Sequence, residues 1–190
     1  LSRTLHAVVS GVEEALDAEG VTLLATDLDT DGGKFFLGAG VPTTSEDDEG
    51  RMVRALRRIA DAGLPLPLQL GVNRGHVFAA EVGIPDRAAY SAMGDTTNTA
   101  ARIMSTAQNG VIHAHPSVLE HSRTRFAVTP AGPFTMKGKA VPMSVYAVGE
   151  EIGTQEAVQD SRLPFLGRDE EATTVRRALE EALTGSGGVI

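Results

Sequence analysis

The apolar positions of this chain recur at two spacings, one helical and one strand-like. In residues 2–18 they recur every three or four positions, which predicts an amphipathic helix that ends at Gly20. Residues 45–63 repeat this spacing, with Ser45 as the expected N-cap, acidic residues after it and basic residues near the end. Because a helix dipole favours acids at its start and bases at its end, a second helix with one buried face is predicted here.

Two hairpins are predicted from shorter apolar runs that are separated by turn residues. Residues 21–29 and 34–40 flank the sequence Thr-Asp-Gly-Gly, whose Asp-Gly and Gly-Gly steps accept the positive φ angles of a tight turn. Residues 66–83 are interpreted in the same way, with Asn-Arg-Gly at 73–75 as the turn. The first half of the chain is therefore expected to contain two antiparallel strand pairs.

The second half continues as a mixture of helices and strands. We predict, in chain order, a helix from about Thr96 to 106, a strand at 111–114, a helix at 116–122, and strands near 125–129 and 143–148. Hairpins and helices do not alternate here as strict β-α-β units. The predicted fold class is therefore mixed α/β of the α+β kind, with a mainly antiparallel sheet covered by helices.

A domain boundary is predicted near residue 150. Residues 150–163 lose the apolar period and are interpreted as a linker, so that 1–149 form the main domain. Residues 164–190 contain one charged amphipathic helix, which we interpret as the start of a second, truncated domain. The Gly-Ser-Gly-Gly sequence in it is not a phosphate-binding loop, because the pattern Gly-x₄-Gly-Lys-Ser/Thr is absent from the sequence.

Composition narrows the class of protein. A chain of 190 residues with 42% hydrophobic content can bury one ordinary core, and a net charge of −8 without any Lys/Arg run argues against a nucleic-acid partner. The sequence has no cysteine, no signal-peptide pattern and no apolar stretch of the roughly 20 residues that a membrane span needs. We therefore expect a cytoplasmic protein and no membrane partner. Because the chain starts at Leu1 within a helical pattern, we interpret it as a fragment.

A polar pair lies in the alanine-rich helix predicted from Thr96. Asn98 and Arg102 are four residues apart, so they project from the same side of a helix. Asp95, Thr96 or Thr97 is expected to cap the first turn. Asn98 then lies near the helix N-terminus, where free N–H groups and the helix dipole favour an anion such as phosphate. The alternative interpretation is a solvated polar stripe.

Four blocks of sequence, in this order, resemble the class III adenylate/guanylate cyclase catalytic domain: LQLGVNRGHVFAAEVG, YSAMGDTTNTAARIM, GVIHAHPSVLE and FTMKGKAVPMSVYAV. The resemblance covers roughly residues 1–149, and the Gly-Asp-x-x-Asn-x-Ala-Ala-Arg block is its most specific part. It implies a ferredoxin-like fold, a head-to-tail homodimer with two sites at its interface, and formation of a 3′,5′-cyclic nucleotide and pyrophosphate from ATP or GTP. Residues 164–190 resemble the segment that joins such domains to a regulatory ATPase in large bacterial proteins.

The resemblance also implies roles for individual residues. Asn98 and Arg102 would serve the transition state in which the ribose 3′-oxygen attacks the α-phosphate, where donors to the developing phosphoryl charge matter most. Lys137 would bind the triphosphate, and Ser91 holds the place of the residue that hydrogen-bonds the purine. One protomer would supply carboxylates for two divalent ions, Mg²⁺ or Mn²⁺, and the other would supply Asn98 and Arg102.

The sequence departs from the family pattern at the metal site. One metal-binding aspartate of the family lies on a first strand, before the point that corresponds to Leu1. The second aligns with Gly33, and Asp29 replaces the purine-selecting lysine. Asp31 is the carboxylate that could substitute after a shift of the hairpin, because Mg²⁺ requires oxygen ligands that a glycine side chain cannot supply. The fragment is therefore expected to be impaired or inactive.

Two other segments contain residue types found in metal sites. Residues 27–32 reproduce the first half of an EF-hand loop, but the twelfth position is Gly38 and strand-like runs flank the segment, so a solvated turn is favoured. His113 and His115 lie two residues apart with no third ligand nearby, and we interpret them as surface residues.

Two functions of different classes remain open. The first is a nucleotidyl cyclase. The second is a catalytically degenerate, cyclase-like sensory or dimerisation module that regulates an attached ATPase. Asn98, Arg102 and Lys137 favour the first function, whereas Gly33 and Asp29 favour the second.

Overall fold

The computed structural model describes residues 2–29, 32–84, 87–135, 141–155 and 169–184. Its elements are α1 (Ser2–Glu19), β1 (Thr22–Asp29), β2 (Gly32–Gly38), α2 (Asp48–Asp61), β3 (Leu70–Val72), β4 (Phe78–Ile84), β5 (Arg87–Met93), α3 (Asp95–Met104), β6 (Ile112–Ala114), α4 (Pro116–His121), β7 (Thr124–Phe134), β8 (Met143–Thr154) and α5 (Asp169–Leu183). They form two compact units, residues 1–156 and 157–190, which are described separately.

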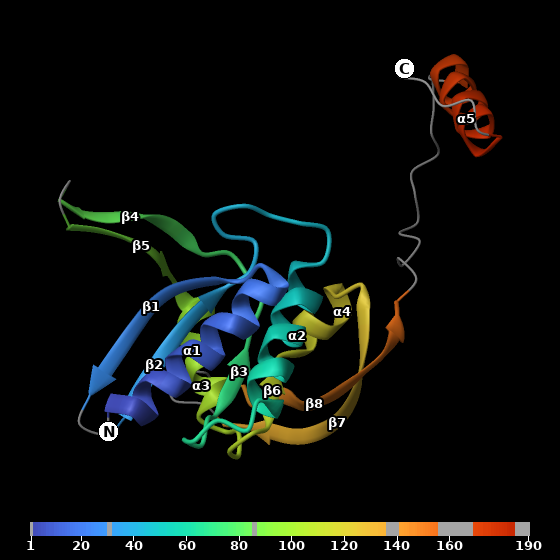
Figure 1. Cartoon of the computed structure of the whole chain (residues 1–190). Coiled ribbons are helices and arrows are strands. Elements are labelled where there is room, and N and C mark those ends of the chain that lie inside the picture. The colour runs from blue at the N-terminus through green and yellow to red at the C-terminus, as the bar shows by residue number, and fades with distance from the viewer. Residues whose placement is uncertain (1, 30–31, 85–86, 136–140, 156–168, 185–190) are drawn as a thin grey trace. The chain divides into compact units, whose positions relative to one another are not determined.

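The first unit contains three sheets (Figure 1). The hairpins β1–β2 and β4–β5 are antiparallel pairs, and four strands form a sheet in the order β3-β6-β8-β7. In that sheet β3 and β6 are parallel, whereas β8 is antiparallel to both of its neighbours. The structure therefore confirms the predicted α+β class with mainly antiparallel strand pairing.

The second predicted hairpin is wrong. Residues 73–75 do separate two strands, but β3 pairs in parallel with β6 and β4 pairs with β5. The apolar run that ends at Val72 pairs with another apolar strand far along the chain, and local turn residues do not predict this pairing. The true partner of β4 was missed because β5 is rich in alanine and serine, which have low strand propensity.

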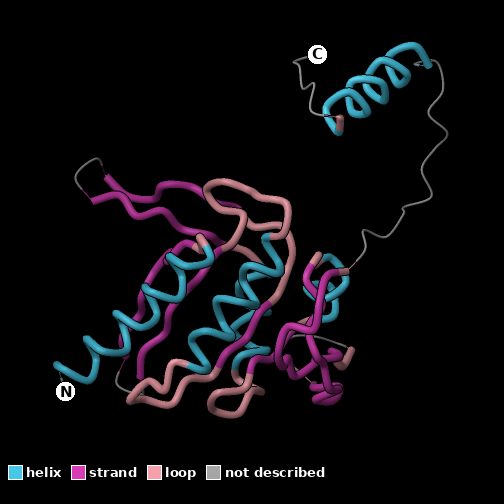
Figure 2. The backbone as a smooth tube through the Cα atoms, turned by 45° about the vertical axis from the view of Figure 1, so that its right-hand side comes forward, coloured by secondary structure: helices cyan, strands magenta, loops and turns pink. Residues whose placement is uncertain are grey.

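The helices α1 and α2 lie side by side and cover one face of the unit (Figures 1 and 2). Both were predicted from their apolar spacing, and their buried residues, among them Val12, Val53 and Leu56, form the main core with Leu70 and Val72 of β3. Leu70 and Val72 are two residues apart, so they project from the same face of the strand. This face of β3 is therefore directed towards α1 and α2.

The helix α3 packs on the opposite face of β3. Gly71 lies between the two core residues of the strand, and a Cβ atom built on it would collide with the backbone of Met104. Only a glycine lets α3 approach the strand this closely. The other side of α3 buries Ile103 in a second cluster with Val145 and the half-buried Phe134. The helix is thus enclosed on two sides.

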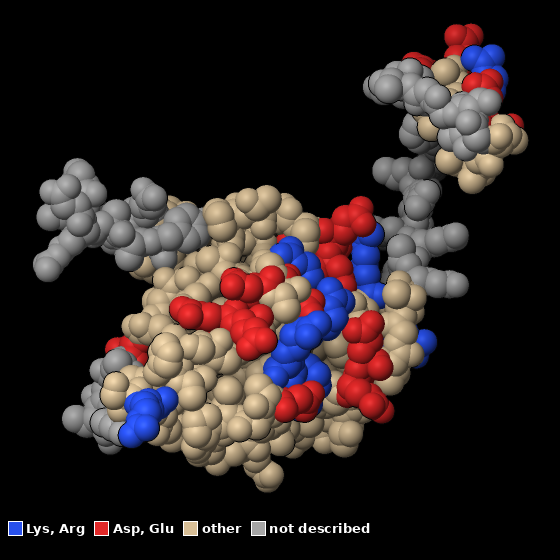
Figure 3. Space-filling model, in the orientation of Figure 1, with Lys and Arg blue, Asp and Glu red and all other residues tan. Residues whose placement is uncertain are grey.

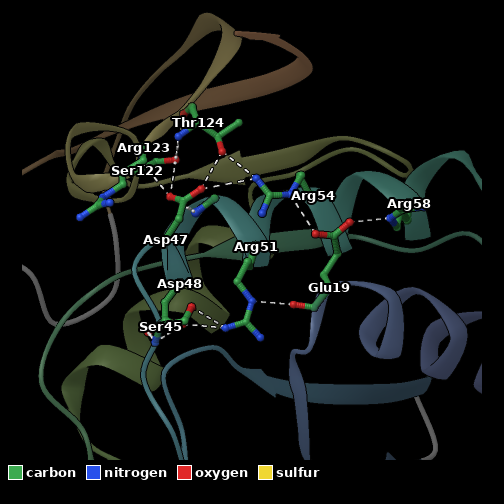
Figure 4. A network of polar contacts seen from close by, with 11 residues as sticks. Glu19, Ser45, Asp47, Asp48, Arg51, Arg54, Arg58, Ser122, Arg123 and Thr124 are labelled. Atoms are coloured by element: carbon green, nitrogen blue, oxygen red, sulfur yellow. Dashed lines mark hydrogen bonds and ion pairs between the residues drawn. The ribbon is translucent and has the colours of Figure 1, made fainter. Parts of the chain in front are cut away.

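A network of ion pairs joins α1, α2 and the start of β7 (Figure 4). The buried carboxylate of Glu19 at the end of α1 accepts hydrogen bonds from Arg54 at 2.8 Å and from Arg58 at 2.7 Å. Arg51 donates to the carbonyl oxygens of Glu19, at 2.6 Å, and of Gly20, which satisfies acceptors at the C-terminus of α1. Three arginines of α2 therefore bind the C-terminal end of α1.

Both predicted N-caps differ from those observed. The cap of α2 is Asp47, whose carboxylate accepts from the Gly50 amide at 3.2 Å, whereas Ser45 donates its hydroxyl to Asp48. The N-cap of α3 is Gly94, which makes no side-chain capping bond. In both cases several candidate caps lie within a few residues, and the backbone path that selects one of them is set by tertiary packing.

The elements after α3 occur in the predicted order, and β7 and β8 are longer than predicted. The structure confirms β6, α4, β7 and β8, and β8 extends to Thr154 because β7 pairs with it as far as Thr124. The first residues of the segment 150–163 are therefore strand, and 156–163 lie outside the described residues. In the second unit, α5 is the helix expected within 164–190, with Val175, Leu179 and Leu183 exposed. Among the described helices, none combines the length and the apolar character of a membrane span.

Candidate functional site

A cleft of about 1270 Å³ opens in the first unit between the β1–β2 hairpin, β3, β5 and α3. Its floor is made by apolar side chains of α1 and α2, such as Val12, Met52 and Leu56. Apolar residues of β2, such as Phe35 and Leu37, also line it, and polar residues join the lining from the first turn of α2, the loop at residues 73–77, β5 and α3. An apolar wall with a few polar groups is typical of a site for an organic ligand.

The predicted purine-binding residue lies at this cleft. Ser91 is half-buried on β5, where it pairs in register with Ala80 of β4, and its side chain lines the cleft. A hydroxyl group in this place can both donate and accept a hydrogen bond. The position suits the recognition of a base edge, and this role stays a prediction.

Asn98 and Arg102 lie on a different side of α3. The helix lines the cleft with Thr97, Ala100 and Met104, whereas neither Asn98 nor Arg102 lines it. Asn98 is exposed and Arg102 is half-buried, one turn further along the same face. Within the part of the chain that the structure describes, the Arg102 guanidinium forms no ion pair. The predicted pair is therefore brought together, but it is directed away from the cleft that Ser91 lines.

The other predicted site residues cannot be placed in the same way. Lys137 and Asp31 lie outside the described residues, as does the side chain of Asp29, whose backbone ends β1. Gly33 lies on β2 and lines the cleft, but it carries no ligand atom on its side chain. The described residues contain no group of three or more histidine or acidic side chains able to hold a metal ion. These residues do not fit the divalent ions that the family resemblance implies.

The EF-hand alternative is excluded by the secondary structure around residues 27–32. An EF-hand loop joins two helices, whereas this segment joins β1 to β2, and Gly38 is a residue of β2. The expected hairpin is confirmed at this position.

The interpretation of His113 as a surface residue is wrong. Its side chain is only 6% exposed on β6, its Nδ1 atom lies 2.8 Å from the Thr106 hydroxyl, and burial lowers its pKa below the ordinary value. His115 is half-buried and caps α4 by accepting from the Ser117 amide at 3.3 Å. Burial lowers its pKa too, against the opposing charge of Glu120. Both histidines are structural.

Sequence analysis missed the role of the loop at residues 73–77. Arg74 in this loop forms an ion pair of 2.5 Å with Glu49 in the first turn of α2. Asn73 donates its side-chain amide to the Thr96 carbonyl at 3.1 Å, and the Thr96 hydroxyl donates to the His76 carbonyl at 2.7 Å. The loop thus contacts two helices. The only signal in the sequence was the Asn-Arg-Gly turn, which was assigned to a hairpin.

Charge on the face formed by α1 and α2 is mixed. In Figure 3 the basic side chains on this face lie between acidic ones, in keeping with the ion pairs of Glu19, Asp47 and Asp61 to arginines of α2. A surface that tracks nucleic-acid phosphates would gather its basic groups without such acids. This face therefore gives no support to a nucleic-acid partner.

The chain is similar in sequence to adenylate and guanylate cyclases. A family model described as the adenylate and guanylate cyclase catalytic domain matches residues 49–150. An adenylate cyclase of Mycobacterium bovis is 28% identical over 160 residues, which cover 80% of this chain and 35% of the relative. A receptor-type guanylate cyclase of Caenorhabditis elegans is 31% identical over 101 residues, 51% of this chain and 9% of that protein. The chain spans about a third of the mycobacterial relative.

Solved structures show the same fold. The guanylate cyclase domain of RhGC from Catenaria anguillulae in complex with GTP aligns with a TM-score of 0.68 and 23% identity, over 78% of this chain and 83% of that one. The adenylyl cyclase CyaB from P. aeruginosa aligns with a TM-score of 0.65 and 19% identity, over 79% and 82%. At these identities the likeness concerns the fold alone.

Proposed function

We propose, from the premise that this chain belongs to the adenylate and guanylate cyclase catalytic domain family, that it binds ATP or GTP and contributes Asn98 and Arg102 to formation of a 3′,5′-cyclic nucleotide. The observation that carries the proposal is the shared face of α3. An amide and a guanidinium stand one turn apart there, and no ion pair within the described residues engages the guanidinium. Both groups can donate hydrogen bonds to phosphoryl oxygens.

Asn98 and Arg102 would act electrostatically, by stabilising negative charge. As the ribose 3′-oxygen attacks the α-phosphate and pyrophosphate leaves, negative charge develops on the phosphoryl oxygens. Donors already fixed in place stabilise that charge more than water does, because they need no reorganisation during the reaction. Lys137 would add a positive charge at the triphosphate, and Ser91 would hold the purine edge.

The orientation of α3 favours a site shared between two subunits. Asn98 and Arg102 do not line the cleft of their own chain, so a nucleotide that they contact extends beyond that cleft. Near the start of α3, Phe78 and Met93 lie opposite each other on β4 and β5, 67% and 47% exposed. Paired exposed apolar side chains of this size are typical of protein interfaces. We infer a head-to-tail homodimer.

Catalytic impairment is part of the proposal. Mg²⁺ or Mn²⁺ is the cofactor expected from the family, but the described residues do not supply its ligands. Gly33 therefore favours a second candidate function, a degenerate cyclase-like module that binds nucleotide or dimerises and regulates an ATPase-type domain following residue 164. Nucleotide binding by the α3 face is common to both functions.

The test is calorimetric binding of ATP and GTP to residues 1–190, with Arg102→Ala as the variant and Arg125→Ala as the control. Arg125 is an exposed arginine on β7. Loss of a charge-assisted bond should weaken binding roughly 10-fold or more in the Arg102 variant, with little change in thermal midpoint. Equal affinity of wild type and the Arg102 variant would refute nucleotide binding by this face of α3, which both candidate functions require. Residues 1–190 alone should form no cyclic nucleotide above background with Mg²⁺ or Mn²⁺, because the described residues do not supply the metal ligands that the reaction needs.

A further inference from the structure

The first turn of α3 is fastened to the loop at residues 73–77 by two hydrogen bonds. The Thr96 hydroxyl donates to the carbonyl of His76 at 2.7 Å. The Asn73 side-chain amide donates to the carbonyl of Thr96 at 3.1 Å. Thr96 thus uses both its side chain and its main chain on the same loop. We call this arrangement of Asn73, His76 and Thr96 the Thr96 clasp.

The clasp requires the glycine that lies within the loop. A Cβ atom built on Gly75 would lie 2.7 Å from Oγ1 of Thr96 and 3.3 Å from its Cγ2. Real Cβ atoms do not approach other atoms as closely as the first distance, so any side chain at Gly75 would push Thr96 away. The glycine therefore serves close packing of loop against helix.

The N-cap of α3 adds no side-chain bond to the clasp. Its N-cap, Gly94, has no side-chain capping bond, and the amide of Asn98 reaches the Gly94 carbonyl only at 3.4 Å. The Thr97 hydroxyl also donates to that carbonyl, at 2.8 Å, and so stays within its own turn. Because uncapped helix ends fray, the two bonds from the loop help to hold this turn.

The loop itself is anchored at its other side. Arg74 forms its ion pair of 2.5 Å with Glu49, and Glu49 belongs to the first turn of α2. The first turn of α3 is thereby connected through one loop to the first turn of α2. Asn98 follows Thr96 by two residues, so the position of its amide depends on this connection.

We infer that Thr96 is a positioning residue for the nucleotide site: the Thr96 clasp fixes the first turn of α3 and thereby the place where Asn98 presents its amide. The inference rests on the proposed function, because it assigns the fixed position of Asn98 to nucleotide recognition. It predicts that the clasp can be broken with little loss of global stability but with a loss of nucleotide affinity.

The experiment uses residues 1–190 and three substitutions of neighbouring threonines. Thr96→Val removes the hydroxyl at constant shape, Thr96→Ser retains it, and Thr97→Val removes a hydroxyl that bonds only within its own turn. Gly75→Ala attacks the clasp from the loop side, with Gly149→Ala as its control, because a Cβ on Gly149 makes only ordinary contacts at 3.4 Å. Hydrogen exchange of amides 97–99, calorimetric binding of ATP and GTP, and the thermal midpoint are measured for each protein.

The expected result separates the variants. One hydrogen bond contributes a net factor of roughly three to ten, so Thr96→Val and Gly75→Ala should speed first-turn exchange and weaken nucleotide binding by about that factor. Thr96→Ser and Gly149→Ala should stay within about twofold of wild type in both measurements. Thr97→Val serves as a control for first-turn exchange alone, because Thr97 itself lines the cleft. Exchange in the core strands and the thermal midpoint should change little in the Thr96 series.

Three outcomes would overturn the inference. Unchanged first-turn exchange in Thr96→Val would show that there is no clasp. Faster exchange with wild-type nucleotide affinity would show a clasp that positions nothing, and equally fast first-turn exchange in Thr97→Val would show a general effect of the helix turn. Wild-type protein that binds neither ATP nor GTP would instead overturn the proposed function, and the positioning role with it.

Discussion

Asp47→Ala is expected to destabilise the first unit more than removal of any neighbouring acid. The Asp47 carboxylate accepts hydrogen bonds from the Thr124 hydroxyl at 2.6 Å, the Arg123 amide at 2.8 Å and the Gly50 amide at 3.2 Å. It also lies 3.4 Å from Arg54 in an ion pair. One carboxylate thus caps α2 and joins it to the first residue of β7 (Figure 4).

The magnitude follows from these contacts. Loss of an N-cap costs roughly 0.5–2 kcal/mol, and loss of hydrogen bonds to a charged group costs about 1.5–3 kcal/mol. These terms overlap because the same oxygens serve both, so we expect a loss of about 2–4 kcal/mol in the free energy of unfolding. Asp47→Asn retains an acceptor oxygen without the charge and should lie between Asp47→Ala and wild type.

Urea unfolding followed by circular dichroism measures this change, and Glu46→Ala is the control. Glu46 pairs with Arg123 at 2.8 Å, but its side chain is 84% exposed, so its loss should cost less than about 0.5 kcal/mol. An Asp47→Ala protein within about 0.5 kcal/mol of wild type would contradict the reasoning. So would an equal loss in both variants.

The pH dependence gives an independent check on the same residue. Burial raises the pKa of Asp47, but hydrogen bonds from Thr124 and from the Arg123 and Gly50 amides outweigh it, so the pKa lies below the ordinary 3.8. A lowered folded-state pKa means that the stabilisation is present above pH 3.8 and is lost as the pH falls through the folded value. The difference between wild type and Asp47→Ala should therefore shrink at pH values below about 4.

Two further predictions concern the packing around α3. Burial lowers the pKa of His113 below 6.5, so the unfolded chain binds more protons at this residue than the folded chain does. The contribution of His113 to stability should therefore be full above pH 6.5 and decline below it. The thermal midpoint of His113→Asn should fall less between pH 6.5 and 5 than that of wild type, and an equal fall would contradict this reasoning. Gly71→Ala would place a methyl group against the Met104 backbone and should lower the free energy of unfolding, measured in urea, by about 3 kcal/mol or more. The control Gly149→Ala should lower it by less than about 1 kcal/mol. Similar losses in the two variants would refute the close approach of α3 to Gly71.

The elements that sequence analysis predicted well are those whose signal is local. The apolar spacing of α1 and α2 recurs within each segment and is long enough to define a buried face, so both helices are confirmed within a few residues. The pairing of β3 with β6 depends on residues some forty positions apart. Periodicity within residues 66–83 therefore indicates a strand at Leu70–Val72 but does not identify the strand that pairs with it.

The candidate site shows the same division. The spacing of Asn98 and Arg102 predicts that they share a helix face, and their exposure agrees with it. Which way this face points depends on how α3 packs, through Gly71 on one side and Ile103 on the other. Burial of His113 likewise depends on the place of β6 inside the four-stranded sheet, and two histidines in a short strand-like run give no sign of it.

The way α3 is held bears on the choice between a functional pair and a solvated polar stripe. At its N-terminus the Thr96 clasp fixes the first turn, and near its C-terminus Met104 rests against Gly71. Just beyond, the Thr106 hydroxyl gives its hydrogen to the Ile103 carbonyl at 2.7 Å. It must therefore accept from Nδ1–H of His113, which fixes the tautomer of that ring.

A solvated stripe does not require such fixation, because water adapts to a moving side chain. A pair of donors that stabilises charge in a transition state does require it, since preorganisation is the source of its advantage over water. The helix is restrained at both ends and on two faces, and Asn98 and Arg102 lie on a face that does not line the cleft. This arrangement supports assigning Asn98 and Arg102 to the binding of a nucleotide. The contacts that hold α3 come from β3, β6 and the loop at residues 73–77, so they fix the helix relative to the rest of the first unit.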